Sequence, residues 1–521
     1  MSKISRNSLC DCGSGKKYKK CHGSIETMDR IHRTAKELLA DHQAKELQRK
    51  QQQGLGRPII STEINGERFV AVRNKLMRSK KWKTFHDFLF SYITNVMTPE
   101  WGNGEIKKPL AERHPILIWY NYLCEQQQKH FDGESDIRHA PMTGAIAAYL
   151  NLANDLYALD HNIDLQDKLI ARLQNHDNFY GARYEVYVAA CLIRAGFLIH
   201  FENEDDRNST HCEFVATDPS TGRKFSVEAK RSHSNKKRFG KLLLRALAKN
   251  AEYERIVFID MNLAETSESG SALSLLNESI RQLRKHEHKD HPQAYVFFTN
   301  TPWHHQLDSE NFQCTVIAEG FKIPTFKMDA RYSSLSEANN ARENHVELHN
   351  LLKSMQLHSH VPTTFSGEIP LFEFGESEDR LLIGKRYKIP DDSGLTRIGL
   401  ITSAVVLENE KNAVCAIAFE NGSSELYKFP LSDCEMDAWR MHPDTFFGVI
   451  TPNNKTIVDP LGLYDFYLET YKQTPKEKLL EFLAEMPNIN ELVKLDQKAL
   501  ARIYSEYCTN AALASFESGG K

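Results

Sequence analysis

The chain contains 521 residues, which is more than one hydrophobic core normally organises, so we expect several domains. Hydrophobic residues make up 41% and charged residues 26%, as in an ordinary globular protein, which excludes a largely disordered chain. The formal net charge of −3 at pH 7 excludes a polycation that binds nucleic acid through its total charge, so any such binding must be local.

The sequence contains no segment suited to a membrane. No stretch approaches the roughly 20 apolar residues that span a bilayer, and the N-terminal residues lack the apolar core of a signal peptide. Seven of the ten cysteines are scattered singly along the chain, a pattern typical of a reducing compartment. We therefore expect a cytoplasmic protein without a membrane partner.

Residue types that bind zinc are clustered near the N-terminus, at Cys10, Cys12, Cys21 and His22. Two closely spaced ligands, a loop and a second close pair can hold one Zn²⁺ ion in a tetrahedron. Gly13 and Gly15 allow the chain to turn around the ion. Because so short a segment cannot bury a core, we predict a structural zinc knuckle over residues 1–24 whose folding depends on the metal. A phosphate-binding loop is excluded, because Lys17 stands where Ser or Thr must follow the lysine.

The run CDCGSGKKYKKCH within residues 6–23 closely resembles the SEC-C motif, the zinc-binding tail of the bacterial preprotein translocase motor. The resemblance implies a docking module for a secretion chaperone or the ribosome, not a catalytic site. No motor ATPase signature occurs elsewhere in the chain, so only the module is carried over.

The next segments are mainly helical by pattern. Residues 25–53 are rich in helix-forming residues without Pro or Gly, which predicts a helical linker. A hairpin turning at Asn65-Gly66 is predicted over residues 57–72. Helical patterns follow at about 82–97, 114–129, 142–158 and 163–175. We predict a mostly helical domain over residues 54–175.

The pattern then changes to helix, strands, helix, strand, helix and strand over residues 176–330, which predicts an α/β sandwich. A polar linker is expected over residues 331–378. Short strands separated by turn residues predict a small β-barrel over residues 379–450, and residues 451–521 form a helical C-terminal region. The predicted fold class is therefore multidomain α+β.

Three charged residues of a predicted hairpin can form a metal site. Glu228 and Lys230 are two residues apart on a strand, so their side chains point to the same face. The preceding strand of the hairpin brings Glu213 alongside them. Two carboxylates can hold Mg²⁺ or Mn²⁺, and an ammonium group can steer or deprotonate a water molecule. Cleavage of a phosphodiester requires these groups.

Residues on either side extend this site. Glu185 lies upstream on the apolar face of a predicted helix, where a carboxylate requires a partner or a role. Downstream, residues 223–249 hold ten Lys or Arg against one acid, which suits a nucleic-acid backbone. The residues predicted to contact nucleic acid are Arg231, Lys236, Lys237, Arg238, Lys241 and Arg245.

The order of these features resembles the PD-(D/E)xK nuclease superfamily over residues 176–330. The resemblance implies a restriction-endonuclease-like core in which Glu213, Glu228 and the carbonyl of Ala229 bind Mg²⁺. It also implies that Lys230 assists the attacking water and that Glu185 helps to hold a metal.

The hairpin departs from the family pattern, which has an Asp where this chain has Glu213, preceded by Cys212. The departure leaves three alternatives open: a shifted metal, Asp205 or Asp206 as the true ligand, or a site that no longer cleaves.

A purely structural explanation is also open. Glu228 and Lys230 could form a surface pair on an edge strand, with Glu185 paired to Arg183 or Arg194. The adjacent His304 and His305 are expected on a loop surface and not as joint metal ligands, because neighbouring residues face apart on a strand.

We therefore expect a bacterial, metal-dependent nuclease or nuclease-like DNA-binding protein with a zinc knuckle as its docking arm. A role in defence against foreign DNA follows by analogy alone. The rival hypothesis is a non-catalytic adaptor whose knuckle, helical block and barrel recruit a ribosome, chaperone or nucleic acid. A third hypothesis, suggested only by the knuckle, is an accessory of protein secretion.

Overall fold

The structure is a computed structural model. It describes residues 7–21, 25–130, 140–163, 165–201, 212–232, 239–264, 269–285, 287, 290–328, 332, 334–368, 380–390, 396–419, 423–451 and 460–519. The chain divides into two compact units, each described by itself below. The N-terminal unit comprises residues 1–51 and 366–455, and the main unit comprises residues 52–365 and 456–521.

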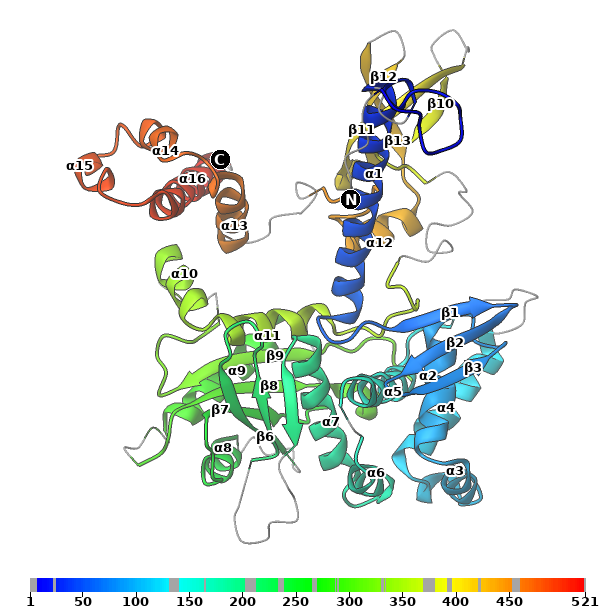
Figure 1. The fold of residues 1–521 in the computed structure, drawn as a ribbon. Coiled ribbons are helices and arrows are strands. Elements are labelled where there is room, and N and C mark those ends of the chain that lie inside the picture. Colours follow the sequence, from blue (N-terminus) through cyan, green and yellow to red (C-terminus); the bar gives the residue numbers. More distant parts are fainter. Residues whose placement is uncertain are drawn as a thin grey trace. The chain divides into compact units, whose positions relative to one another are not determined.

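A six-stranded sheet in the order β4-β5-β6-β7-β8-β9 lies at the centre of the main unit (Figure 1). The strands are Leu198–Phe201, Phe214–Thr217, Lys224–Arg231, Glu254–Asp260, Ala294–Asn300 and Thr315–Phe321. Strands β4, β5 and β6 are antiparallel, β6, β7 and β8 are parallel, and β9 runs antiparallel to β8. All residues of β8 are buried, as expected for a parallel strand covered on both faces.

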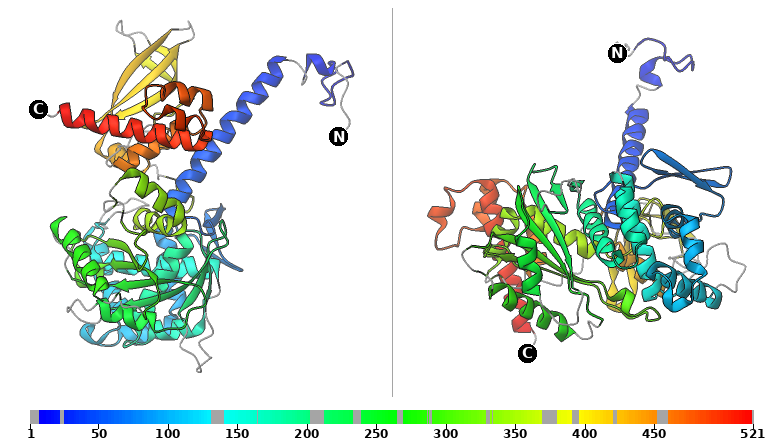
Figure 2. Two further views of the ribbon diagram at one scale, coloured as in Figure 1. Left: turned by 90° about the vertical axis from the view of Figure 1, so that its left-hand side faces the viewer. Right: turned by 90° about the horizontal axis from the view of Figure 1, so that it is seen from below.

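Helices cover both faces of this sheet, as Figures 1 and 2 show. Helix α7 (Phe179–Arg194) shares a core with Val227 and Ala229 of β6. Helices α8 (Phe239–Leu247) and α9 (Ser269–Arg284) pack on the opposite face, in a core that includes Val257 and Ile259 of β7. Since successive strand residues alternate between faces, Glu228 and Lys230 lie on the α8 face.

The segment before α7 contains a small sheet and five helices. The strands β1, β2 and β3 are Ile60–Ile64, Glu67–Val72 and Lys75–Ser79. The helices α2 to α6 are Phe85–Val96, Pro99–Ile106, Pro115–His130, Gly144–Asn162 and Asp167–Gln174. The predicted hairpin is confirmed, since Asn65 and Gly66 have φ angles of 52° and 72°, the left-handed values that its turn needs. The four predicted helices are confirmed too, while strand β3 and helix α3 were not predicted.

The main unit continues after the sheet with helices. Helices α10 (Leu335–Asn344) and α11 (Val346–Leu357) lie in the segment predicted to be a polar linker. This segment is packed and is not a polar linker, because Leu348, Leu351 and Leu352 of α11 belong to the same hydrophobic core as α7 and the sheet. The helices at the C-terminus, α13 to α16, are Pro460–Tyr471, Lys476–Phe482, Ile489–Leu492 and Gln497–Gly519.

The N-terminal unit contains the knuckle, a long helix and a four-stranded sheet. Helix α1 spans Ile25–Gln53, as predicted, and Gln48 donates a hydrogen bond of 3.4 Å to the carbonyl of Thr445. The strands β10 to β13 are Arg386–Pro390, Thr396–Leu407, Asn412–Phe419 and Ser424–Pro430, and α12 is Asp433–Met441. Trp439 of α12 packs in one core with Ile401 and Cys415.

The predicted small barrel is not confirmed. The four strands form an antiparallel meander in the order β10-β11-β12-β13, so β10 and β13 are its two edges in the described part of the unit. Strand β12 alternates between buried and half-buried residues, which is the pattern of a sheet with only one face packed. An alternating pattern is common to open sheets and barrels, so the sequence did not distinguish them.

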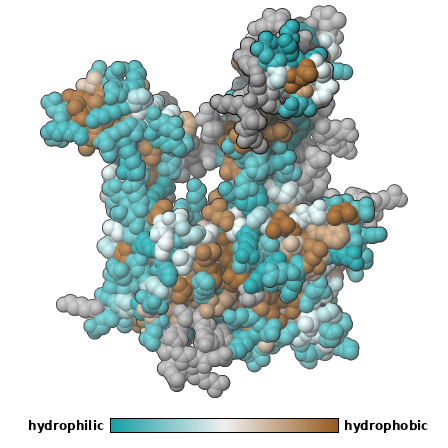
Figure 3. All heavy atoms as spheres, viewed as in Figure 1, coloured by the Kyte–Doolittle hydropathy of each residue, from teal (hydrophilic) through white to brown (hydrophobic). Residues whose placement is uncertain are grey.

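Hydrophilic residues cover most of the face shown in Figure 3. Among the residues that the structure describes, no helix combines the length and the apolar character needed to cross a bilayer.

Candidate functional site

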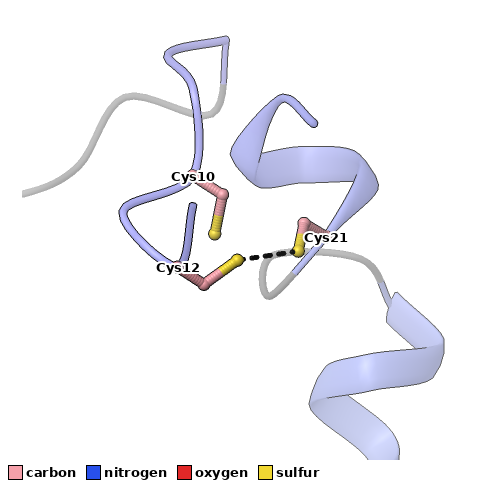
Figure 4. Close-up of side chains that lie close together, drawn as sticks. All are labelled: Cys10, Cys12 and Cys21. Atoms are coloured by element: carbon pink, nitrogen blue, oxygen red, sulfur yellow. Dashed lines mark hydrogen bonds between the residues drawn. The ribbon is translucent and has the colours of Figure 1, made fainter. Parts of the chain in front are cut away.

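The thiols of the knuckle converge on one point (Figure 4). The Sγ atoms of Cys10, Cys12 and Cys21 all lie within 4.8 Å of one another, and those of Cys12 and Cys21 are 3.6 Å apart. Tetrahedral Zn–S bonds of about 2.3 Å place two sulfur atoms roughly 3.8 Å apart. The three thiols therefore fit one zinc ion. His22 lies outside the described residues, so its role as the fourth ligand stays a prediction.

The backbone of the knuckle brings these thiols together. The amide of Cys10 donates to the carbonyl of Lys16, and the amide of Tyr18 donates to that of Ser8, each over 2.8 Å. A short 3₁₀ helix, η1 (Tyr18–Lys20), then carries the chain to Cys21. Gly13 and Gly15 have φ angles of 75° and 66°, a left-handed conformation that costs other residues free energy.

Ser14 lies between two of the thiols. Its Oγ atom is 3.1 Å from the Sγ atom of Cys12 and 3.3 Å from that of Cys21. Hydrogen bonds with the side chain and backbone of Ser14 lower the pKa of Cys12. The hydrogen bond with Ser14 also acts to lower the pKa of Cys21, but the hydrogen bond with Cys12 and desolvation raise it overall. Because zinc binds the thiolate, Ser14 favours metal binding at Cys12. In the described part of the chain, no other set of three Asp, Glu, His or Cys side chains is close enough to hold a metal.

The second candidate site lies on the hairpin formed by β5 and β6. Phe214 pairs with Val227, so Glu213 lies opposite Glu228 at the end of β5. The Nζ atom of Lys230 is 3.8 Å from Oε1 of Glu213 and forms an ion pair with Glu228. The structure thus brings together the three residues that the sequence placed on one face.

Glu228 is a buried carboxylate, with only 1% of its side chain exposed. Its Oε1 atom faces the ammonium groups of Lys230 and Lys249, and beyond these two lysines neither oxygen atom has a hydrogen-bond partner among the residues described. Burial, and then the negative charge of Glu213, raise the pKa of Glu228 to about 7, although Lys230 and Lys249 oppose the shift. Glu228 lies on β6, which has β5 on one side and β7 on the other. The alternative of a surface pair on an edge strand is therefore wrong.

Glu213 and Glu228 are the two facing carboxylates of this group. Carboxylate oxygens are the ligand type that Mg²⁺ and Mn²⁺ take, so these two residues would hold such an ion if it bound. In the structure, Lys230 supplies the positive charge between them.

Glu185 does not join this pair. It lies on α7, which covers the opposite face of the sheet, and it forms an ion pair with Arg172 of α6. The partners that the sequence suggested for it, Arg183 and Arg194, were wrong. The Arg172 partner was missed because an ion pair between two successive helices depends on how the helices pack, which residue spacing does not show.

Of the six residues predicted to contact nucleic acid, two lie on α8, one lies on the other face of the sheet, and three lie outside the described residues. Lys241 and Arg245 are exposed four residues apart on α8, so they share one helix face. Arg231 lies instead on the α7 face, where its Nε atom is 3.1 Å from Oδ2 of the buried Asp260. Lys236, Lys237 and Arg238 lie outside the described residues, as do Asp205 and Asp206.

Sequence reasoning did not assign two neighbours of Glu228. Lys249 follows α8, and its Nζ atom is 3.8 Å from Oε1 of Glu228. Cys212 is buried, and its Sγ atom donates to the carbonyl of Asn250 over 3.4 Å. Burial, and then the charge of Glu228, raise the pKa of Cys212 to about 11, so this thiol stays protonated. The sequence placed Lys249 in the basic window of residues 223–249, together with Lys241 and Arg245, but did not place it beside Glu228.

The comparisons with known proteins match the knuckle. Residues 6–24 match the SEC-C motif. No curated protein and no solved structure matches the chain. The SEC-C match covers the three thiols that converge in the structure, so the chain carries a SEC-C motif whose cysteines can hold zinc.

The raised pKa of Glu228 predicts a pH-dependent stability. A carboxyl that holds its proton up to pH 7 when folded, but only to about pH 4.5 when unfolded, stabilises the fold at low pH. That contribution is complete below pH 4.5 and is lost as the pH rises through 7, about 3 kcal/mol in all. Without divalent cations, Glu228→Gln should therefore remove most of the fall in unfolding free energy between pH 5 and pH 8.5.

Urea unfolding at a series of pH values measures this effect. Glu213→Gln is the matched variant, because removing its charge should move the fall to lower pH without abolishing it. Parallel pH curves for wild type and Glu228→Gln would contradict the prediction.

Proposed function

We propose that residues 176–330 form a metal-dependent nuclease that hydrolyses phosphodiester bonds of nucleic acid, with DNA as the first candidate. The observation that carries the proposal is the group of Glu213, Glu228 and Lys230 on adjacent strands. The order of elements supports it too: α7, the antiparallel strands β4 to β6, then α8, β7, α9 and β8. That is the order on which the likeness to the PD-(D/E)xK superfamily rests.

Each residue has a role in this proposal. Glu213 and Glu228 hold the cation, which neutralises charge on the phosphate and lowers the pKa of its bound water. Lys230 places its ammonium group beside both carboxylates, where it can orient a water molecule. Lys241 and Arg245, on the exposed face of α8, attract the backbone phosphates.

A cleavage assay tests the proposal. Plasmid, linear and single-stranded DNA and RNA are incubated with the full chain, with and without Mg²⁺ or Mn²⁺. We expect metal-dependent cleavage that Lys230→Ala reduces by about 100-fold or more, the contribution typical of a group that handles a proton. Lys224→Ala is the matched control, because Lys224 is an exposed lysine at the other end of the same strand and should be dispensable. Absence of cleavage by wild type, or equal cleavage by Lys230→Ala, would reject the nuclease.

A docking function is the second candidate, and the knuckle favours it. Lys16, Lys17, Lys19 and Lys20 are all exposed there, so the motif presents a basic surface to an anionic partner such as a ribosome or an acidic chaperone. If wild type shows no cleavage while Cys10→Ser loses a bound partner in a pull-down, the adaptor is the better explanation.

A further inference from the structure

A second polar cluster lies at the carboxyl ends of the parallel strands. Arg231 ends β6, Asn262 follows β7, and His304 and His305 follow β8 in the short helix η3 (Pro302–His305). Arg183 joins them from α7, because its guanidinium lies 5.6 Å from the ring centre of Trp303 in η3, and we call these five residues the basic cluster. In open α/β sheets, ligands bind outside the carboxyl ends of the parallel strands, so this is the expected end of the sheet for a ligand.

Arg183 is a buried cation without an acceptor. Only 9% of it is exposed, and its guanidinium lies over the rings of Trp119 and Trp303, at 5.3 and 5.6 Å from their centres. Aromatic faces attract a cation but leave the five N–H donors of an arginine unused. Among the described residues, Arg183 forms no ion pair and no hydrogen bond, and none of its nitrogen atoms is sealed from solvent.

The neighbouring carboxylates are already paired. Asp155 pairs with Arg194, and Asp260 pairs with Arg231. Three guanidinium groups therefore share two carboxylates. Asp260 and Asp155 attract Arg183 electrostatically, but neither forms an ion pair with it, so the group keeps one more positive than negative charge. A buried charge is rarely retained without a partner or a function.

The rest of the cluster is hydrogen-bonded around Asn262. The Oδ1 atom of Asn262 is 2.7 Å from Nη2 of Arg231, and 3.1 and 3.0 Å from the Nε2 atoms of His304 and His305. One amide oxygen has two lone pairs, which Arg231 and His305 can fill, while Nε2 of a neutral His304 can accept from Nη2 of Arg231 over 3.2 Å. Burial, and then the charge of Arg183, lower the pKa of His304 to about 2, as expected in a positive environment.

We propose that the basic cluster binds a phosphate-class oxyanion, either free phosphate or the terminal phosphate of a nucleotide. The oxyanion supplies the acceptor that Arg183 lacks, Arg231 adds positive charge beside it, and arginine forks match its geometry. Tyr180 supports the cluster from α7, with its ring centre 4.4 Å from the guanidinium of Arg231. The site lies on the opposite face of the sheet from Glu228, so it does not rest on the proposed nuclease.

Calorimetric titration of the full chain with inorganic phosphate and with AMP tests the site. We expect binding that Arg183→Lys weakens by about tenfold or more, because lysine lacks the planar fork. Lys224→Met removes an exposed cation at the other end of β6, so it should bind phosphate as wild type does. Tighter binding of phosphate or of AMP identifies the source. No binding by wild type, or loss in Lys224→Met with retention in Arg183→Lys, would overturn the proposal.

Thermal melting separates binding from a structural role. Without phosphate, Arg183→Met should melt no lower than wild type, because it replaces an unpaired buried charge by an apolar side chain of similar length. Phosphate should then raise the melting temperature of wild type but not of the variant. A melting temperature lower in every buffer, with an unchanged phosphate response, would show that Arg183 only supports the fold. If Arg183→Met does not fold, the affinity of Arg183→Lys decides.

Discussion

Serine in place of Cys21 is expected to abolish zinc binding by the full chain. Wild type should carry one Zn²⁺ per chain, and the variant none, because a hydroxyl is a far weaker zinc ligand than a thiolate. The folding free energy supplied by the metal, on the order of 10–16 kcal/mol in small zinc modules, would be lost from the knuckle. Metal analysis of the purified chain measures the first effect. Trypsin measures the second, because Lys16, Lys17, Lys19 and Lys20 become rapid cleavage sites when the knuckle unfolds.

Cys434→Ser is the matched control, because Cys434 is another exposed cysteine and lies far from the knuckle in sequence. It should keep its zinc and its resistance to trypsin. A chelator added to wild type should reproduce the Cys21→Ser cleavage pattern. Full zinc content in Cys21→Ser would contradict the assignment of the thiols as ligands.

Alanine in place of Asp155 is expected to lower the unfolding free energy of the main unit by about 3–5 kcal/mol. Asp155 of α5 pairs with Arg194 of α7, and 6% and 10% of their side chains are exposed. Removing the acid leaves a buried guanidinium without its counter-ion, which costs more than the pair itself contributes. Urea unfolding followed by tryptophan fluorescence measures the loss, since Trp82, Trp119 and Trp303 are buried in the same unit.

Two variants test the explanation. Glu481→Ala breaks the exposed pair with Lys478, whose side chains are 64% and 54% exposed, and should cost at most about 1 kcal/mol. The double variant Asp155→Leu, Arg194→Met replaces both charges with apolar side chains and should recover most of the loss. Equal losses in the single and double variants would show that the pair acts by packing and not by charge.

The local features of this protein were open to prediction. The predicted zinc ligands lie within thirteen residues, and their spacing predicted the three thiols that converge in the knuckle. The hairpin at Asn65-Gly66 and the shared face of Glu228 and Lys230 follow from backbone geometry over a few residues. Helix α1 and the alternation of helices and strands after α7 followed from pattern and composition.

The environment of each charged residue required the tertiary structure. Arg231 was predicted on a nucleic-acid surface, but β6 is an interior strand, and the next residue after Lys230 turns to the α7 face and pairs with Asp260. Glu185 was predicted beside the hairpin acids, but α7 covers the other face, so it pairs with Arg172. Whether a meander closes into a barrel depends on edge pairing, which the alternation of β12 does not determine.

The sequence by itself therefore determined the zinc module, most helices and strands, and the side of β6 on which an acid and a lysine meet. Only the tertiary structure decided which helix covers that side, that Lys249 approaches Glu228, and that Arg183 is buried without an ion pair among the described residues. The physical reason is the distance along the chain over which each interaction acts. Spacing and turn chemistry act over a few residues, whereas burial and ion pairing depend on packing between segments that lie far apart along the chain.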